Sequence, residues 1–224
     1  MRETGAITHA VAGEELCLLP EKAIFWQRKK SLFVADLHLG KSGHFRKSGI
    51  PVSSLVHHED LNRLSAVLAA WPVETIYLLG DLFHSFHNRE WKQFMDWRMQ
   101  YPKVNFHLVK GNHDILDDQL ILDGNILLHH ESLIVEPFFL SHKPVTNSEN
   151  SYYQFYGHLH PGVRMNGKGL QSLSFPCFCF GVKSAVLPAF GGFTGYSNVQ
   201  PSSCDAVFIV YNNLVKQIVH PGKT

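Results

Sequence analysis

Five apolar segments of the sequence end on side chains that can bind a metal ion or move a proton. In chain order, these side chains are Asp36 and His38, then Asp81, then Asn112, His113 and Asp114, then His142, and finally His158 and His160. Carboxylate and amide oxygens combined with imidazole nitrogens suit Mn²⁺, Fe or Zn²⁺ bound for catalysis. They are too many ligands for one ion, whereas two ions roughly 3.5–4 Å apart can clamp a phosphoryl group and activate a water. The pattern therefore predicts a dinuclear centre for phosphoryl chemistry.

The elements that must position these residues alternate between strands and helices in the first half of the chain. We expect strands at residues 14–27, 31–37, 75–81 and 104–114, and helices at residues 53–71 and around Trp91 to Arg98. Such alternation implies parallel pairing, and ligand sites of such sheets lie beyond the carboxyl ends of their strands. Glycines at three of these ends (Gly80, Gly111 and Gly157) let the backbone approach closely.

The second half of the sequence is rich in strands and poor in helices. Residues 133–142, 151–160 and 205–220 have strand-like patterns, and Asn212-Asn213 is a credible hairpin turn. The predicted fold is a single α/β domain over residues 1–224, a two-sheet β-sandwich with mixed pairing, flanked by helices. Its 224 residues suffice for one sizeable core.

The metal-binding pattern resembles that of the calcineurin-like metallophosphoesterases. The series Asp36-x-His38, Gly80-Asp81, Gly111-Asn112-His113-Asp114, His142 and Gly157-His158-x-His160 occurs in that family's order. More narrowly, the stretches ADLHLGKSGHFRKSGIPV, LGDLFHS, LSHKP, GHLHP and LPAFGGFTG resemble the PdeM-like, ligase-associated DNA damage response endonucleases of bacteria. The resemblance implies the four-layer metallophosphoesterase fold.

The resemblance also assigns a role to each position. Asp36, His38 and His160 would bind the first metal ion. Asn112, His142 and His158 would bind the second, and Asp81 would bridge the two. His113 would be catalytic, donating a proton to the leaving oxygen or stabilising charge on the phosphate. The cofactors implied are two divalent ions, with Mn²⁺ favoured over Fe or Zn²⁺.

Two positions depart from the family pattern. Many members have a second acid three residues after the bridging aspartate, which orients the catalytic histidine, and here that position is His84. The group that orients His113 could therefore be Asp114, a backbone carbonyl or His84. Ser141 precedes His142 where relatives often have glycine, and we expect this change still to permit metal binding.

The sequence defines the substrate less well than it defines the chemistry. A net charge of +1 argues against binding nucleic acid by charge alone, so a polyanion must be held by the metals or by a local patch. Lys41, His44, Arg46 and Lys47 are either a solvated loop or such a patch, binding phosphate oxygens. Residues 187–198 are either a tight structural turn or a wall of the substrate cleft.

Three functions from different classes follow. The first is a phosphodiesterase or endonuclease acting on DNA in bacterial DNA repair, with a DNA ligase, a helicase and an exonuclease as partners. The second is a hydrolase of a small phosphoester, such as a nucleotide, a lipid-sugar pyrophosphate or a phosphoprotein. The third is a catalytically silent scaffold; the presence of His113 and a full set of ligands argues against it.

The remaining features of the sequence predict a cytoplasmic protein. No apolar run approaches a membrane span, and the acidic residues near the start argue against an export signal. The four cysteines (Cys17, Cys177, Cys179 and Cys204) form no CxxC pair, and we expect reduced, buried thiols. For Cys177 and Cys179, in the stretch FPCFCFG, alternate burial in a strand is preferred to metal binding.

Overall fold

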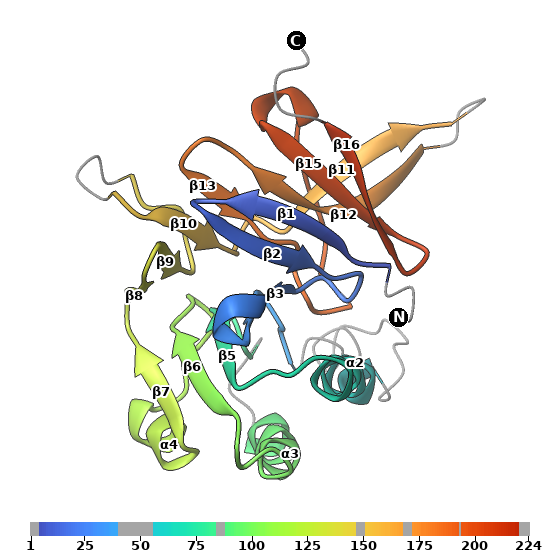
Figure 1. Ribbon diagram of the computed structural model, residues 1–224. Helices are drawn as coiled ribbons and strands as arrows, with labels where there is room; N and C mark the ends of the chain where they lie inside the picture. The colour runs from blue at the N-terminus through green and yellow to red at the C-terminus, as the bar shows by residue number, and fades with distance from the viewer. Residues whose placement is uncertain are drawn as a thin grey trace.

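Two mixed β-sheets pack face to face, and helices cover the outer face of the first sheet (Figure 1). The computed structural model describes residues 5–39, 56–83, 88–146, 151–167, 172–192 and 194–219. The two-sheet α/β sandwich with mixed pairing is therefore confirmed. In the described part of the chain, the three α-helices all lie on the side of the first sheet.

The first sheet contains seven described strands in the order β1-β2-β3-β4-β5-β6-β7. Their bounds are β1 Ile7–Val11, β2 Glu14–Leu18, β3 Ile24–Trp26, β4 Ser31–Val34, β5 Thr75–Leu79, β6 Asn105–Val109 and β7 Ile126–His129. The pairs from β1 to β4 are antiparallel, and those from β4 to β7 are parallel. The carboxyl ends of β4, β5 and β6 consequently lie at one edge of the sheet.

The three described α-helices cover the first sheet because each presents an apolar face to it. They are α2 Val56–Ala70, α3 Asn88–Arg98 and α4 Asp118–Asp123. Leu61, Leu64 and Leu68 of α2 recur three or four residues apart and pack into the core on this side. The helix ends before Pro72, in agreement with the expected end at residue 71, while residues 53–55 of the expected helix lie outside the described residues.

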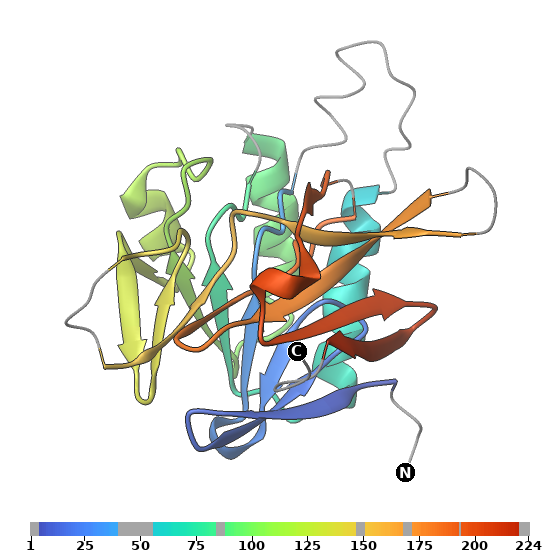
Figure 2. The ribbon, with the colours of Figure 1, turned by 90° about the horizontal axis from the view of Figure 1, so that it is seen from above.

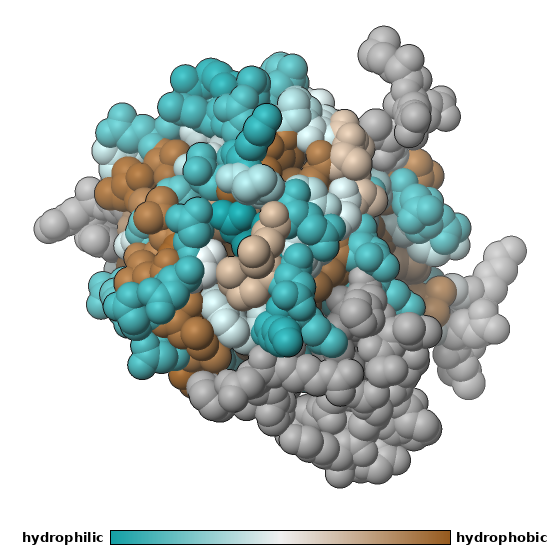
Figure 3. Space-filling model, turned by 90° about the horizontal axis from the view of Figure 1, so that it is seen from below, coloured by the Kyte–Doolittle hydropathy of each residue, from teal (hydrophilic) through white to brown (hydrophobic). Residues whose placement is uncertain are grey.

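The outer surface of this helical layer is mainly hydrophilic where it is described (Figure 3). Apolar side chains gather along the edge that contains α4, β7 and β8, and the exposed ones in these elements include Leu122, Leu127 and Ile134. β7 and β8 are edge strands of four residues each, and such short edges limit pairing with other chains.

The second sheet contains nine described strands, with the order β14-β11-β12-β13-β10-β9-β8 and the β15–β16 hairpin attached to β12. Their bounds are β8 Ser132–Val135, β9 Phe138–Ser141, β10 Tyr153–Tyr156, β11 Pro161–Asn166, β12 Ser172–Phe180, β13 Ser184–Val186, β14 Ser197–Asn198, β15 Ala206–Tyr211 and β16 Leu214–Val219. β9 and β10 are parallel, so their carboxyl ends also lie together (Figure 2).

Aromatic side chains fill the space between the two sheets. The rings of Trp26 and Phe138 meet at 4.7 Å between centroids, and Phe138 and Phe155 meet edge to face at 4.9 Å. Phe33 lies 5.4 Å from Phe155, so residues of both sheets interdigitate. This close packing fixes the strand ends of one sheet relative to those of the other.

Several predicted strands are wrong in their bounds. The segment 14–27 is two strands, because the chain turns at residues 19–23, which include Pro20. The segment 133–142 is likewise a hairpin of β8 and β9, interrupted at Pro137, rather than one strand. The strands expected at 31–37, 75–81, 104–114 and 151–160 end before the predicted ligands, at Val34, Leu79, Val109 and Tyr156. The hairpin turn at Asn212-Asn213 is confirmed, and both residues have the positive φ that a type I′ turn needs (49° and 58°).

The expectation of four reduced cysteines is wrong for two of them. Cys179 of β12 and Cys204, just before β15, form a disulfide with a Cα–Cα distance of 5.8 Å. Cys17 and Cys177 are free thiols. Spacing along the sequence did not reveal this pair, because the two cysteines meet only through the pairing of β12 with β15. Cys177 and Cys179 pack in one apolar cluster and Phe178 and Phe180 in another, so the side chains of β12 alternate between its two faces; burial itself does not alternate, because Phe178 is as buried as Cys177.

No helix in the described ranges is long and apolar enough to cross a membrane.

Candidate metal centre

The predicted ligands lie at one edge of the sandwich because five parallel strand ends converge there. Asp36 and His38 follow β4, Asp81 follows β5, and Asn112 and His113 follow β6. His142 follows β9 and His158 follows β10 in the other sheet. Each strand is anchored in the aromatic core, so its terminal side chains are held in place by packing.

Asp36, His38 and His160 form the first ligand group. The Nε2 atoms of His38 and His160 are 3.2 Å apart, and Nε2 of His160 lies 3.5 Å from Oδ1 of Asp36. Asp36 is completely buried and His38 nearly so, whereas His160 is partly exposed. The group therefore opens toward solvent at His160.

Asp81, His142 and His158 form the second group, and Asn112 lies beside it. Nε2 of His142 is 3.1 Å from Nδ1 of His158 and 3.0 Å from Oδ1 of Asn112. Nδ1 of His142 lies 3.0 Å from the carbonyl oxygen of Leu79, which can only accept a hydrogen bond. The proton of neutral His142 is thus on Nδ1, and the Nε2 lone pair points into the group.

Asp81 lies between the two groups. Its Oδ1 is 3.4 Å from Nε2 of His142, and its Oδ2 is 3.8 Å from Nε2 of His38. One carboxylate thus presents an oxygen to each group, the arrangement that a bridging ligand needs.

The backbone at the ligands is left-handed. Asp36, His38, Asp81, His158 and His160 have φ between 46° and 65°. For residues with a Cβ, this conformation costs on the order of 1–3 kcal/mol each and persists only when the surroundings impose it. Within this left-handed turn, Asp36 and His38 both belong to the first ligand group.

Two glycines make room for the ligands. Gly80 has φ of 78°, and a Cβ there would strike the ring of His142. A Cβ on Gly157 would strike Oδ2 of Asp36 and lie 2.8 Å from Cβ of Ala35. The backbone N–H of His158 instead donates to that Oδ2 at 2.8 Å. The close approach of strand ends from the two sheets therefore depends on glycine at both positions.

The residues fit a pair of divalent cations. Oδ1 of Asp36 is buried and has no hydrogen-bond partner within the described ranges, although a buried carboxylate oxygen normally has one. The His142 lone pair faces an amide oxygen, an approach that a cation between them would make favourable. Burial, with His142 and Lys143 adding positive charge, lowers the pKa of His158 and favours the neutral imidazole that binds metal.

His113 lies at the rim of the centre. Its backbone N–H donates to Oδ1 of Asp81 at 2.9 Å, and its ring meets that of His38 at 5.5 Å between centroids. Asp114 accepts hydrogen bonds from the backbone N–H groups of Phe83 (3.2 Å) and Gly111 (2.9 Å). Both of its oxygens thus tie the β5 and β6 ends together, and burial raises its pKa to about 6.

Several predicted residues lie outside the described residues. They are Lys41, His44, Arg46 and Lys47 of the basic loop, and His84, one of the groups considered for orienting His113. Ser141 is described and buried: its hydroxyl donates to the carbonyl oxygen of Lys143 at 2.7 Å and accepts from Gln154. The serine therefore stabilises the turn that carries His142.

Sequence reasoning missed Lys143. This exposed residue follows His142 directly, and its charge lowers the pKa of His158. Its place in the stretch LSHKP, next to a predicted ligand, was the available signal.

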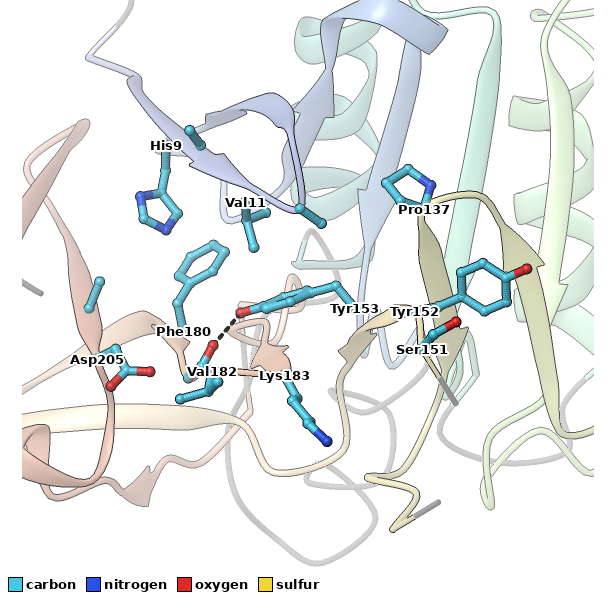
Figure 4. A pocket seen from close by; sticks show the side chains of 14 residues that line it. His9, Val11, Pro137, Ser151, Tyr152, Tyr153, Phe180, Val182, Lys183 and Asp205 are labelled. Atoms are coloured by element: carbon cyan, nitrogen blue, oxygen red, sulfur yellow. Dashed lines mark hydrogen bonds between the residues drawn. The ribbon is translucent and has the colours of Figure 1, made fainter. Parts of the chain in front are cut away.

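A cavity of about 840 Å³ opens at the opposite edge of the sandwich (Figure 4). His9 and Val11 of β1, with Tyr153 and Phe180 of the second sheet, line it. β10 begins here, whereas His158 follows its other end, so the cavity is separate from the metal centre.

The fold and the convergent ligands define a metallophosphoesterase. The chain belongs to the calcineurin-like phosphoesterase family, whose model matches residues 29–201. It is accordingly a metal-dependent phosphoester hydrolase.

Within this family, the chain is similar to a nuclease of the MPE type. It is similar to the nuclease MPE of Pseudomonas putida, with 29% sequence identity, a TM-score of 0.82, and coverage of 95% of this chain and 100% of that one. A protein of unknown function from Aquifex aeolicus, AQ665, matches 62% of this chain and 82% of its own at 21% identity, with a TM-score of 0.43. Among curated proteins, none matches the sequence.

Proposed function

We propose that the protein is a dinuclear phosphodiesterase that cleaves DNA. The observation that carries this proposal is the sharing of Asp81 between two ligand groups at the edge where His113 also lies. The similarity to a nuclease over nearly the whole chain favours DNA over a small phosphoester.

The residues of the chain have distinct roles in this proposal. Asp36, His38 and His160 would hold one cation, Asn112, His142 and His158 would hold the other, and Asp81 would offer a carboxylate oxygen to each. When bound, the two cations supply Lewis acidity toward a phosphoryl oxygen and lower the pKa of water. His113 donates a proton to the leaving oxygen, and its backbone N–H places the residue beside the carboxylate of Asp81.

Mn²⁺ is the proposed metal, with Fe or Zn²⁺ as the alternatives, since oxygen atoms and imidazole nitrogens without thiolate suit all three. We further propose a cytoplasmic role in DNA repair alongside a DNA ligase, a helicase and an exonuclease. The PdeM-like stretches of the sequence support this role.

The first test compares metal content and substrate range. The protein loaded with Mn²⁺ should contain two ions per chain, hydrolyse bis-p-nitrophenyl phosphate faster than p-nitrophenyl phosphate, and cleave DNA. Two bound ions with turnover of the monoester alone would favour the small-phosphoester alternative, and two bound ions without any turnover would favour the scaffold.

The second test concerns the basic loop. Neutralising Arg46 and Lys47 together should weaken DNA binding. It should also reduce the slope of the logarithm of the DNA-binding constant against the logarithm of salt concentration by about one unit for each phosphate group that the loop no longer neutralises. Turnover of a small phosphodiester should change much less. The double variant Lys103→Gln, Lys216→Gln removes the same charge from exposed positions elsewhere and should leave the slope unchanged. Weak DNA cleavage by the unmodified protein, together with an unchanged salt dependence of DNA binding in both double variants, would contradict the nuclease proposal.

A further inference from the structure

Residues 190–192, which we call the FGG segment, form backbone hydrogen bonds to the left-handed turn at Asp36. The backbone N–H of Phe190 donates to the carbonyl oxygen of Ala35 at 2.8 Å, and that of Gly191 to the carbonyl oxygen of Asp36 at 3.1 Å. A Cβ on Gly191 would lie only 2.6 Å from the carbonyl oxygen of Leu37. The FGG segment is therefore a structural support directly against the first ligand turn.

Helix α2 holds the other side of the FGG segment. The carboxylate of Asp60 accepts from the backbone N–H of Gly192 at 3.1 and 3.3 Å, and from Arg63 at 2.7 Å. Arg63 also donates to the carbonyl oxygen of Phe190, and its guanidinium lies 4.4 Å from the centre of that ring. Lys22 donates to the carbonyl oxygen of Gly191 at 3.0 Å. Each of these side chains thus holds one backbone group of the segment.

This arrangement goes beyond what packing requires. Asp60 is 5% exposed, and a buried carboxylate is costly unless it is paired and hydrogen-bonded. It touches neither ligand group directly in the hydrogen bonds and ion pairs of the described residues. Asp60 instead accepts from Gly192 of the FGG segment, and the neighbouring Gly191 donates to the carbonyl oxygen of Asp36. The φ of 52° at Asp36 must be imposed by such surroundings.

We propose that Asp60 and Arg63 are positioning residues of the metal centre: through the FGG segment, they hold the left-handed turn that presents Asp36 and His38 to the first cation. This inference rests on the proposed function, because it assigns that cation to Asp36, His38 and His160. The second group, built on β5, β6, β9 and β10, does not bond to the FGG segment in the described backbone hydrogen bonds.

The test measures Mn²⁺ affinity at each group separately. A His158→Ala background keeps the first group, and a His38→Ala background keeps the second. Removing a group that hydrogen-bonds directly to a metal ligand typically weakens affinity about 10–100-fold. Because Asp60 acts one residue further away, Asp60→Ala should weaken the first group by about the lower end of that range and leave the second within about twofold. Asp60→Asn, which can still accept from Gly192, should have a smaller effect, and Arg63→Ala should resemble Asp60→Ala.

Glu14→Gln is the matched control. Glu14 accepts hydrogen bonds from Trp26 and Arg28 at the opposite edge of the first sheet, so its substitution removes a comparable ion pair without touching the FGG segment. Its effect on both affinities should be negligible. At saturating Mn²⁺, kcat of Asp60→Ala should return to the level of the unmodified protein.

Two results would overturn the inference. One is an unchanged first-group affinity in Asp60→Ala, whatever the change in Tm. The other is an equal loss at both groups, which indicates general destabilisation. A protein that binds two Mn²⁺ ions but cleaves no phosphodiester would contradict the proposed function, while the affinity comparison would still decide the roles of Asp60 and Arg63.

Discussion

The backbone N–H of His113 donates a hydrogen bond of 2.9 Å to Oδ1 of Asp81. The proposed general acid is thereby fixed, through its main chain, to the carboxylate proposed to bridge the two cations. Because this hydrogen bond does not involve the imidazole, removing that ring leaves the support of Asp81 in place. The roles of the two residues can therefore be separated by mutation.

His113→Ala should retain two metal ions and lose rate. General acid catalysis typically contributes about 10²–10⁴ in rate, so kcat for DNA should fall by about that factor. The effect should be smaller for bis-p-nitrophenyl phosphate, whose good leaving group needs little protonation. Elemental analysis and kinetics check both points, with His9→Ala at the opposite edge as the control. A parallel loss of metal would instead make His113 a ligand.

Asp81→Asn should lose the second metal first, and nearly all activity with it. The substitution preserves shape but removes the charge that would screen two cations from each other. Metal content per chain is the measurement, and Asp205→Asn, an exposed acid beside the far cavity, is the control. Two ions retained per chain would show that Asp81 does not bridge.

Gly157→Ala should disrupt the first ligand group. The new Cβ would collide with Oδ2 of Asp36 and crowd Ala35, so the strand ends of the two sheets must separate. We expect weaker Mn²⁺ binding and a lower Tm. Gly195→Ala is the control, because no described atom lies within 4 Å of a Cβ there. Unchanged Mn²⁺ affinity in Gly157→Ala would contradict the close approach of β10 to Asp36.

Lys22 should make stability depend on pH above neutrality. Burial lowers its pKa to about 7, with a further lowering by Arg63 that Asp60 opposes. Between about pH 7 and 10.5 the unfolded chain binds a proton that the folded chain has released, so the free energy of unfolding rises with pH in this window.

The measurement is the difference in Tm between the unmodified protein and Lys22→Met. The Tm of the unmodified protein minus that of Lys22→Met should increase from about pH 7 to 9.5 and be constant below about pH 6. Lys183→Met, at an exposed position, is the control. A difference that does not vary with pH would mean that Lys22 keeps its proton in the folded state.

The sequence by itself determined the chemistry and the outline of the fold. Apolar strands that end on Asp36, Asp81 and His142 predict a common edge, because parallel strands place their carboxyl ends together. The strand–helix alternation and the Asn212-Asn213 turn depend on local residue preferences, and these were predicted correctly. Strand bounds were less accurate where Pro20 and Pro137 interrupt apolar runs.

Only the tertiary structure decided how distant segments meet. The disulfide between Cys179 and Cys204, the closeness of Gly157 to Asp36, and the support of the Asp36 turn by Asp60 through the FGG segment each join parts of the chain with no common local pattern. The left-handed φ of Asp36 is likewise disfavoured by its own side chain. Such a conformation is imposed by surrounding hydrogen bonds and packing, which exist only once both sheets have come together.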